Sequence, residues 1–90
     1  MEYEWDEKKR QTNREKHAVD FLEAIDFDWH NAISWIDDRN DYGEIREIAL
    51  GWIKTQLYVM VFTLRNNKVR IISLRKAKPQ EKKIYAKAIN

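Results

Sequence analysis

The 90-residue sequence predicts an α+β fold in which helices pack against a four-stranded, mainly antiparallel sheet. Helix signals are confined to the two ends of the chain, where residues 6–25 and 79–89 carry caps and helical apolar spacing. Between them, residues 32–74 form short apolar runs rich in β-branched and aromatic side chains, separated by turn residues. A chain of this length supports one hydrophobic core, so residues 1–90 are expected to form a single domain in the order α-α-β-β-β-β-α.

The first predicted helix is entirely polar. Asp6 can cap a helix that starts at Glu7, because its carboxylate can accept from backbone N–H groups of the first turn. Residues 7–16 carry no apolar side chain, so this helix has no face to bury. We expect it to be held at its ends, by Trp5 before it and by Ala18 after it, with its polar side chains facing solvent, a ligand or a partner.

The second predicted helix begins at a capping box formed by Asp20 and Glu23. Phe21, Ala24 and Ile25 follow at the i, i+3 and i+4 positions of an α-helix. This spacing predicts one apolar stripe that faces the core.

The pattern changes to that of strands after residue 31. Four strands are expected, followed by a helix that Pro79 opens and whose apolar contacts are Ile84 and Ala88, with Tyr85 as a further candidate. Trp35 and Trp52 are expected to lie in the core. The predicted strands span residues 32–36, 45–53, 57–64 and 69–74, with a solvated turn of acidic residues (37–43) after the first and a tight turn at Asn66-Asn67 before the last.

The register of the last hairpin decides which polar side chains share a face. A two-residue loop places Thr63 and Arg65 on the face of Arg70. A three-residue loop with a bulge places them instead on the face of Ser73 and Arg75. The sequence leaves both alternatives open, and on regular strands the five residues cannot all share one face.

Charge is divided unevenly along the chain, although the net charge is only +2. Residues 1–47 contain 14 Asp and Glu against 7 Lys and Arg, whereas residues 48–90 contain 1 acid against 10 bases. The basic half is a candidate surface for a polyanion. The alternative is that the acidic half folds over the basic half and neutralises it.

Several classes of protein are not expected. The chain has no cysteine, so it forms neither a disulfide framework nor a thiolate metal site. The longest apolar run, residues 57–64, is far shorter than a membrane span, and the acidic N-terminus lacks the apolar segment of a signal peptide. We expect a soluble, cytoplasmic protein that does not contact a membrane.

Two blocks of aromatic, basic and polar residues carry a resemblance to a known family. Together they cover about two thirds of the chain, and in this order and spacing the sequence resembles BrnT-type bacterial toxins. Two positions depart from the family pattern, Ala18 in place of the usual Gly and Leu74 in place of the usual Ala. The first block is Trp5-Asp6, Lys9, Asn13, Lys16-His17, Val19, Phe21 and Glu23-Ala24, and the second is Val61-Phe62-Thr63, Arg65, Arg70-Ile71-Ile72-Ser73, Arg75, Ala77, Glu81 and Tyr85.

The resemblance implies a RelE-like fold and a ribonuclease that arrests translation. It also implies neutralisation by a BrnA-type antitoxin, a ribbon-helix-helix DNA-binding protein, with a heterotetramer of two toxin and two antitoxin chains as the suggested assembly. RNA and this antitoxin are the expected partners.

Cleavage of RNA without a metal needs a group that takes the 2′-OH proton, positive charge at the phosphorane and help for the leaving 5′-oxygen. His17 is the natural acid or base, because its ordinary pKa lies near neutrality. The alternative for His17 is that it only satisfies the last carbonyls of the first helix. The two histidines and the scattered carboxylates form no convincing metal site, so no metal and no cofactor are expected.

Arginine suits phosphate, because its planar fork pairs with phosphate oxygens and stays charged. The predicted catalytic residues are His17, Lys16, Thr63 and Arg65. The predicted substrate-binding residues are Arg70, Ser73, Arg75 and Lys9, with a structural role as the alternative for the first three.

Two other functions compete with the ribonuclease hypothesis. The same basic strands could bind nucleic acid or the ribosome without cutting it. The basic face could also meet an acidic protein partner. Steep salt dependence without a cleaved product would favour the first of these.

Overall fold

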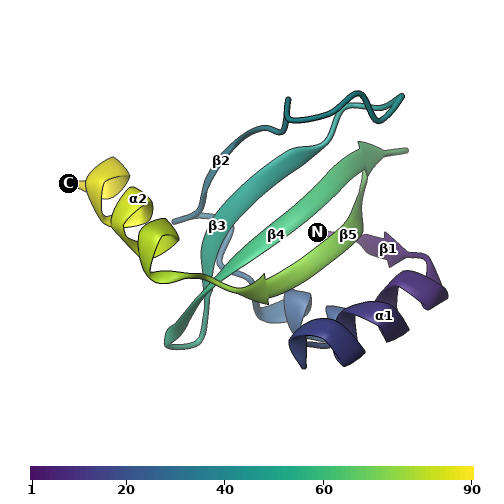
Figure 1. The fold of residues 1–90 in the computed structure, drawn as a ribbon, viewed down its shortest axis with the longest axis horizontal. Helices are drawn as coiled ribbons and strands as arrows, with labels where there is room; N and C mark the ends of the chain where they lie inside the picture. Colours follow the sequence, from purple (N-terminus) through teal and green to yellow (C-terminus); the bar gives the residue numbers. More distant parts are fainter.

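The computed structural model describes residues 1–90 and confirms the α+β class. The sheet has five strands in the order β1-β5-β4-β3-β2 (Figure 1). The elements are β1 (Tyr3–Trp5), α1 (Glu7–His17), the 3₁₀ helix η1 (Phe21–Asp26), β2 (Ile33–Ile36), β3 (Glu47–Ile53), β4 (Gln56–Arg65), β5 (Lys68–Lys76) and α2 (Pro79–Ile89).

The prediction of four mainly antiparallel strands is wrong by one strand. β1 pairs with β5 in parallel, with Tyr3 opposite Val69 and Trp5 opposite Ile71, so the sheet is five-stranded and mixed. Only three residues form β1, which is too short for an alternating pattern to be recognised. Its partner also lies more than sixty residues away in the chain, so local sequence carries no sign of the pairing.

The second predicted helix is also corrected, because η1 has 3₁₀ and not α geometry. A 3₁₀ helix has three residues per turn, so residues three apart share a face. Phe21, Ala24 and Phe27 are accordingly buried, whereas Ile25 is 79% exposed. The predicted capping box at Asp20 and Glu23 is present.

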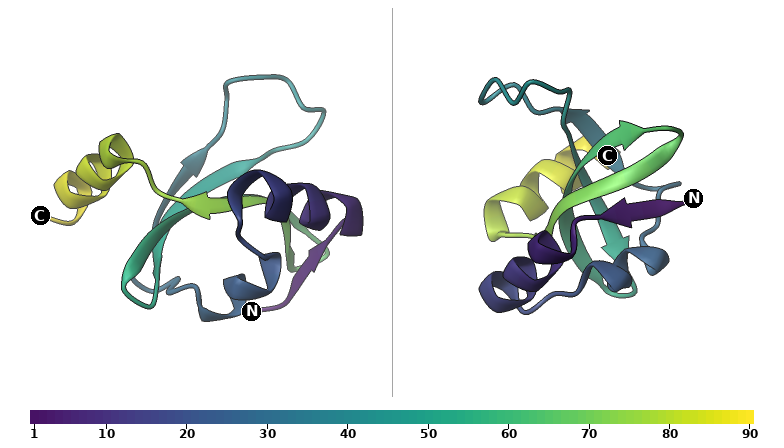
Figure 2. Two further views of the ribbon diagram at one scale, coloured as in Figure 1. Left: turned by 60° about the horizontal axis from the view of Figure 1, so that its bottom comes forward. Right: turned by 90° about the vertical axis from the view of Figure 1, so that its right-hand side faces the viewer.

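Two apolar layers form on opposite faces of the sheet. The larger layer joins η1 to the even-numbered side chains of β4, such as Met60 and Phe62. The smaller layer joins α2 to the odd-numbered side chains of β4, such as Leu57 and Val59, through Tyr85. α2 projects from one end of the sheet (Figure 2), and Tyr85 is its one buried side chain. Ile84 and Ala88, which were predicted as its apolar contacts, are both exposed instead, Ile84 to 50%.

The two tryptophans predicted to be in the core are partly exposed instead. Trp35 lies on the edge strand β2 and Trp52 on β3, and their exposed fractions are 40% and 37%. Trp52 packs edge-on against Tyr85 of α2. The tryptophans that contact the core are Trp29, which packs against Phe27 and Phe62, and Trp5, which packs against Phe21.

The predicted solvated turn after β2 is confirmed for Asp38 and Asp41, which are exposed, but not for Asp37. Asp37 is only 5% exposed and binds Arg39 through two hydrogen bonds of 2.7 and 2.8 Å. The Tyr42 hydroxyl donates to the same carboxylate. The ion pair with Arg39 holds the pKa of Asp37 well below its usual range, so the loop is pinned by a charged side chain that the sequence reasoning placed in solvent.

The β4–β5 hairpin combines the two registers that the sequence left open. Asn66 and Asn67 form a two-residue loop with φ angles of 52° and 63°, and Thr63 accordingly lies opposite Arg70. The pairing then shifts by one residue, because Ile72 is an unpaired bulge residue between the rows of Phe62 and Val61.

This bulge brings all five polar hairpin residues to one face of the sheet. Before the bulge, Arg70 shares the face of Thr63 and Arg65. After it, Ser73 lies opposite Val61 and Arg75 opposite Val59, both on that same face. Regular strands would have divided the set, as the sequence analysis expected.

No helix of this chain is long and apolar enough to cross a membrane.

Candidate functional site

A buried asparagine holds the polar helix α1 along the edge of β5. The Asn13 amide nitrogen donates to the carbonyls of Leu74 at 2.7 Å and Val19 at 2.9 Å. Its oxygen accepts from the Leu74 N–H at 3.1 Å. β1 pairs with β5 only as far as Ile71, so Asn13 satisfies the backbone that β1 leaves uncovered. The helix is therefore anchored at its middle as well as at its ends.

The role of Asn13 was missed by the sequence reasoning. Its only local signal is that asparagine is an unfavourable residue in the interior of a helix, where its amide competes for backbone hydrogen bonds. That signal marks a residue that is retained for a contact outside the helix.

Anchoring α1 in this way creates a groove between the helix and β5. One part of it, about 270 Å³ in volume, lies over the bulge in β5. A second part, about 520 Å³, continues past the C-terminus of α1. The two parts share Lys16 and His17, and we call them together the basic groove. The first is lined by Lys8, Lys9, Thr12, Asn13, Lys16, His17, Ile72 and Ser73, and the second by Lys16, His17, Arg75, Lys76 and Lys78.

The basic groove has no acidic side chain in its lining. Its cations come from both α1 and β5, which are separated in the chain by more than fifty residues. A hollow lined by several ammonium groups and a guanidinium concentrates positive potential and attracts polyanions.

His17 lies where the two parts of the groove meet. Burial lowers the pKa of His17 below its ordinary value, and the nearby charges of Lys16, Arg75 and Lys78 lower it further. The imidazole is therefore mostly neutral at pH 7 and is available to accept a proton. Ala18, in the left-handed conformation with φ 58°, ends α1 immediately after it.

Arg75 is held in the groove by a carboxylate from α2. Its two terminal nitrogens donate to Glu81 at 2.8 and 2.7 Å. The side chains of Arg75 and Glu81 are 25% and 23% exposed. The ion pair lowers the pKa of Glu81, so this carboxylate is ionised at neutral pH.

Arg70 lies on the same sheet face but outside the lining of the groove. One terminal nitrogen of Arg70 donates to Glu4 of β1 at 2.8 Å. The parallel pairing of β1 with β5 places these two residues directly opposite each other. The charge of Arg70 is thus compensated by a residue from the acidic half of the chain.

Thr63 and Arg65 lie at the other end of the hairpin, away from His17. The Thr63 hydroxyl donates to the Ile45 carbonyl at 2.7 Å, and the residue is only 7% exposed. Arg65 is exposed beside the turn and pairs in register with Lys68. Lys68 and Arg75 are seven positions apart in β5, a strand length of roughly 23 Å. The structure therefore does not bring these two residues together with Lys16 and His17.

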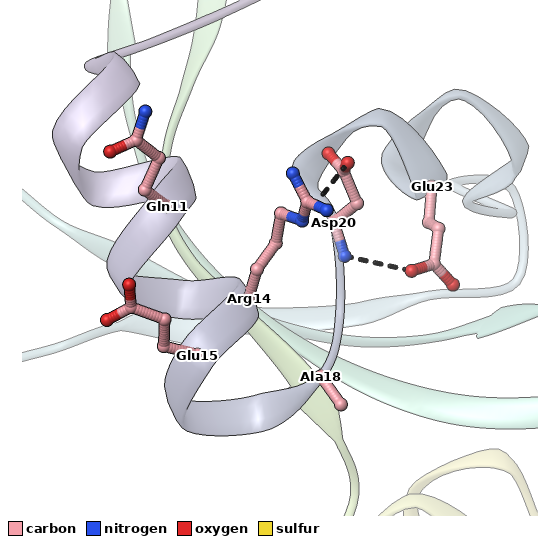
Figure 3. Close-up of a pocket in the computed structure, with 6 residues that line it drawn as sticks. All are labelled: Gln11, Arg14, Glu15, Ala18, Asp20 and Glu23. Carbon is pink, nitrogen blue, oxygen red and sulfur yellow. Dashed lines mark hydrogen bonds and ion pairs between the residues drawn. The ribbon is translucent and has the colours of Figure 1, made fainter.

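The hollow on the opposite side of α1 has a different character. It measures about 590 Å³, and Figure 3 shows that acidic and basic groups in it face each other. Arg14 approaches Asp20 at 3.8 Å, and Glu23 accepts from the Asp20 backbone N–H. Three carboxylates against one arginine give this hollow a net negative lining, so it does not suit phosphate.

The chain contains no group of three or more His, Asp and Glu side chains placed to hold a metal ion. His30 lies in a separate, mainly apolar hollow with Trp52 and Tyr85.

A comparison with known families identifies the chain. The model of one family, described as "Ribonuclease toxin, BrnT, of type II toxin-antitoxin system", matches residues 5–81. This range contains α1, the whole β4–β5 hairpin and every residue that lines the basic groove. No curated protein gives a significant match. Because the family model covers most of the chain, the protein belongs to the BrnT family of ribonuclease toxins of type II toxin–antitoxin systems.

Proposed function

We propose that this toxin arrests translation by cleaving RNA in the basic groove, without a metal ion or cofactor. The observation that carries the proposal is the convergence of a neutral histidine, a lysine and an anchored arginine in a groove without carboxylates in its lining. We propose further that the whole chain acts as one domain, residues 1–90, with a RelE-like fold.

The proposed chemistry is a transesterification by the 2′-hydroxyl of the RNA. His17 takes the proton of this hydroxyl, and the 2′-oxygen attacks the neighbouring phosphorus. Arg75 and Lys16 stabilise the charge that develops on the phosphorane oxygens. The bond to the 5′-oxygen breaks, and the leaving oxygen takes a proton from the Lys16 ammonium. The products are a 2′,3′-cyclic phosphate and a 5′-hydroxyl.

The other predicted site residues receive supporting roles. We assign Lys9 and Ser73 to contacts with the phosphate next to the cleaved bond, because both line the groove. Arg70 and Arg65 lie further along the same sheet face and are proposed to contact flanking phosphates. Thr63, with its hydroxyl bonded to Ile45, is proposed to shape this end of the sheet and not to act in the chemistry.

The proposed partner besides RNA is an antitoxin of the BrnA type, a ribbon-helix-helix protein. The description of the family supports an antitoxin partner of some kind. We propose that two toxin and two antitoxin chains form a heterotetramer in the cytoplasm. Co-expression with the neighbouring reading frame should restore growth, and light scattering of the purified complex should give the mass of four chains.

A cleavage assay with matched arginine variants tests the assignment of the site. Purified protein should cleave RNA in the presence of EDTA, and His17→Ala and Arg75→Ala should each lower the rate by about 100-fold or more. Arg65→Ala is the matched control at the other end of the hairpin and should lower it by less than about tenfold.

Three results would contradict this function. Loss of cleavage on addition of EDTA would show that a metal is required. A larger loss from Arg65→Ala than from Arg75→Ala would move the site to the hairpin turn. Tight, salt-sensitive RNA binding without any cleaved product would favour a non-catalytic RNA- or ribosome-binding module.

A further inference from the structure

Glu81 is the one carboxylate that forms an ion pair with a side chain of the basic groove, and the geometry of this pair indicates its role. Its two oxygens accept from the two terminal nitrogens of Arg75, Nη1 at 2.8 Å and Nη2 at 2.7 Å. Two hydrogen bonds to one carboxylate fix both the plane and the direction of the guanidinium, whereas a single hydrogen bond would not. A lysine in place of Arg75 could not be held in this way, because it lacks the planar fork of two donors.

The bonds to Glu81 occupy only one edge of the Arg75 guanidinium. Nη1 also approaches the Lys76 carbonyl at 3.4 Å, whereas Nε donates to no atom of the chain. A guanidinium has five N–H donors, and the edge formed by Nε and Nη2 is itself a two-donor fork. Arg75 therefore keeps the edge formed by Nε and the second N–H of Nη2 for phosphate, while Glu81 holds the adjacent edge formed by Nη1 and Nη2.

Other arginines of the chain use the donors that Arg75 leaves free for contacts within the protein. Arg10 directs Nε and Nη2 to Asp20 and Nη1 to Glu7, so both of its edges are used within the protein. Arg39 likewise places Nε and Nη2 on Asp37. These two arginines are structural, whereas Arg75 is anchored at one edge and open at the other.

Glu81 also caps α2, and an experiment on Glu81 must separate this role from its contact with Arg75. Its Oε1 also accepts from the Lys78 backbone N–H at 2.7 Å and so caps the first turn of α2. The same carboxylate therefore joins the start of α2 to the end of β5.

We propose that Glu81 is a positioning residue of the ribonuclease: it holds the guanidinium of Arg75 by one edge so that the other edge receives the scissile phosphate. This inference rests on the proposed function of the basic groove. A preset guanidinium loses little freedom when phosphate binds, and its effect is greatest on the transition state, where geometry matters most.

Glu81→Gln separates the two tasks. Glutamine retains an oxygen that caps Lys78, because Gln serves as well as Glu in a capping box. It loses the charge and one of the two acceptors for Arg75. We expect kcat to fall by about tenfold or more and KM to rise by a smaller factor, because the preset guanidinium also favours binding of the ground-state phosphate. The far-ultraviolet circular dichroism and the melting temperature should stay close to those of the wild type.

A double-mutant cycle shows whether Glu81 acts through Arg75. The loss caused by Glu81→Gln should disappear in the Arg75→Ala background, since no guanidinium is left to position. Tyr85→Phe is the matched control: it removes the hydrogen bond of α2 to the Asn31 carbonyl and leaves the Arg75–Glu81 pair intact. It should not reproduce the loss in kcat. Additive losses in the cycle would overturn the proposal, as would an equal loss from Tyr85→Phe.

If the wild-type protein does not cleave RNA, the proposed function is wrong, but the role of Glu81 can still be tested by a binding measurement. The probe is a 2′-O-methyl RNA oligonucleotide, which cannot undergo the reaction. If Glu81→Gln weakens binding of this RNA in the wild-type background but not in the Arg75→Ala background, the result would support the proposal that Glu81 positions Arg75 for phosphate. Unchanged or tighter binding by Glu81→Gln would overturn it, because Glu81 would then be idle or a competitor of the phosphate.

Discussion

At the scale of single residues, the end of α1 combines a groove-lining histidine with a strained backbone. Ala18 adopts φ 58°, a left-handed conformation that the β-carbon of an L-residue disfavours. It follows directly after His17, so the turn that Ala18 makes determines where the histidine lies relative to β5. The BrnT pattern usually has glycine at this position, and the structure gives the physical reason for that preference.

Ala18→Gly is expected to stabilise the protein by about 1 kcal/mol, because glycine adopts the left-handed conformation without steric cost. Urea unfolding followed by circular dichroism measures the change. Ala86→Gly provides the control, since Ala86 is an exposed position within α2 where the same substitution should destabilise by about 1 kcal/mol. Equal effects of the two substitutions would contradict the explanation.

The second prediction at this scale concerns the protonation of His17. Its pKa is lowered by burial and by the positive charges of Lys16, Arg75 and Lys78. The acid limb of kcat/KM should therefore lie below the ordinary histidine value of 6.5. Removing one charge with Lys78→Gln should raise the pKa toward that value, which an NMR titration of the imidazole measures without any need for cleavage.

The lowered pKa of His17 also determines how the stability of the folded protein depends on pH. The unfolded chain binds the His17 proton more readily than the folded chain does. The contribution to stability is therefore complete above about pH 6.5 and declines as the pH falls through the lower pKa of the folded state. Lys87→Gln, at the far end of α2, is the control and should leave the titration of His17 in place. A His17 pKa above 6.5 in the wild type would refute the electrostatic picture.

At the scale of elements, two irregularities determine what the sheet presents. The bulge at Ile72 transfers Ser73 and Arg75 to the face of Thr63, and Ile72 itself lines the groove. The short strand β1 covers β5 only up to Ile71, which leaves the following backbone for α1 to cover through Asn13. The groove exists because β1 ends beside β5 at Ile71, just before the bulge, and α1 becomes the neighbour of β5 after it.

Close packing within the sheet explains a glycine of β3. A β-carbon at Gly51 would overlap the ring of Phe27, which is 5% exposed and packs edge-on against Trp29. Gly51→Ala should therefore destabilise the protein by about 1–3 kcal/mol in thermal or urea unfolding. In the double variant with Phe27→Leu, the two losses should be less than additive, because the smaller side chain makes room for the methyl group. If the two losses of stability were fully additive, overlap with the Phe27 ring would not be the cause of the destabilisation by Gly51→Ala.

At the scale of the whole molecule, the acidic and basic halves of the chain are only partly paired with each other. Of the eight ion pairs, two join the halves, Lys68 with Glu2 and Arg70 with Glu4, both between β1 and β5. Five of the other six ion pairs lie within the first half and involve Glu7, Asp20, Asp37 and Glu44. Neutralisation of the basic half is therefore confined to the β1 side, and the groove retains its positive charge.

The charge of the groove predicts how RNA binding depends on salt. In the non-cleaving His17→Ala background, the affinity for a short RNA should fall linearly with the logarithm of the salt concentration. Adding Lys16→Ala or Arg75→Ala should each reduce the magnitude of the slope by about 1, because one phosphate contact is lost. Lys87→Ala should leave the slope unchanged. Equal effects of all three substitutions would indicate binding to the general charge of the molecule and not to the groove.

The sequence by itself determined those features that depend on near neighbours. The α+β class, the caps at Asp6 and Asp20 and a tight turn at Asn66-Asn67 follow from the preferences of a few consecutive residues, and the structure confirms them. The unequal division of charge between the halves is likewise a property of composition alone. The resemblance to BrnT toxins also needed only the sequence, and the family comparison confirms it.

Tertiary structure decided which of the predicted site residues meet. Lys9, Lys16, His17, Ser73 and Arg75 line one groove, whereas Thr63 and Arg65 lie at the far end of the hairpin. The causes are the parallel pairing of β1 with β5, the bulge at Ile72 and the contact of Asn13 with Leu74. The strand pairing and the bulge are made by backbone groups, which every residue carries, and Asn13 binds the backbone of Leu74, so the periodicity of side chains gives no sign of them.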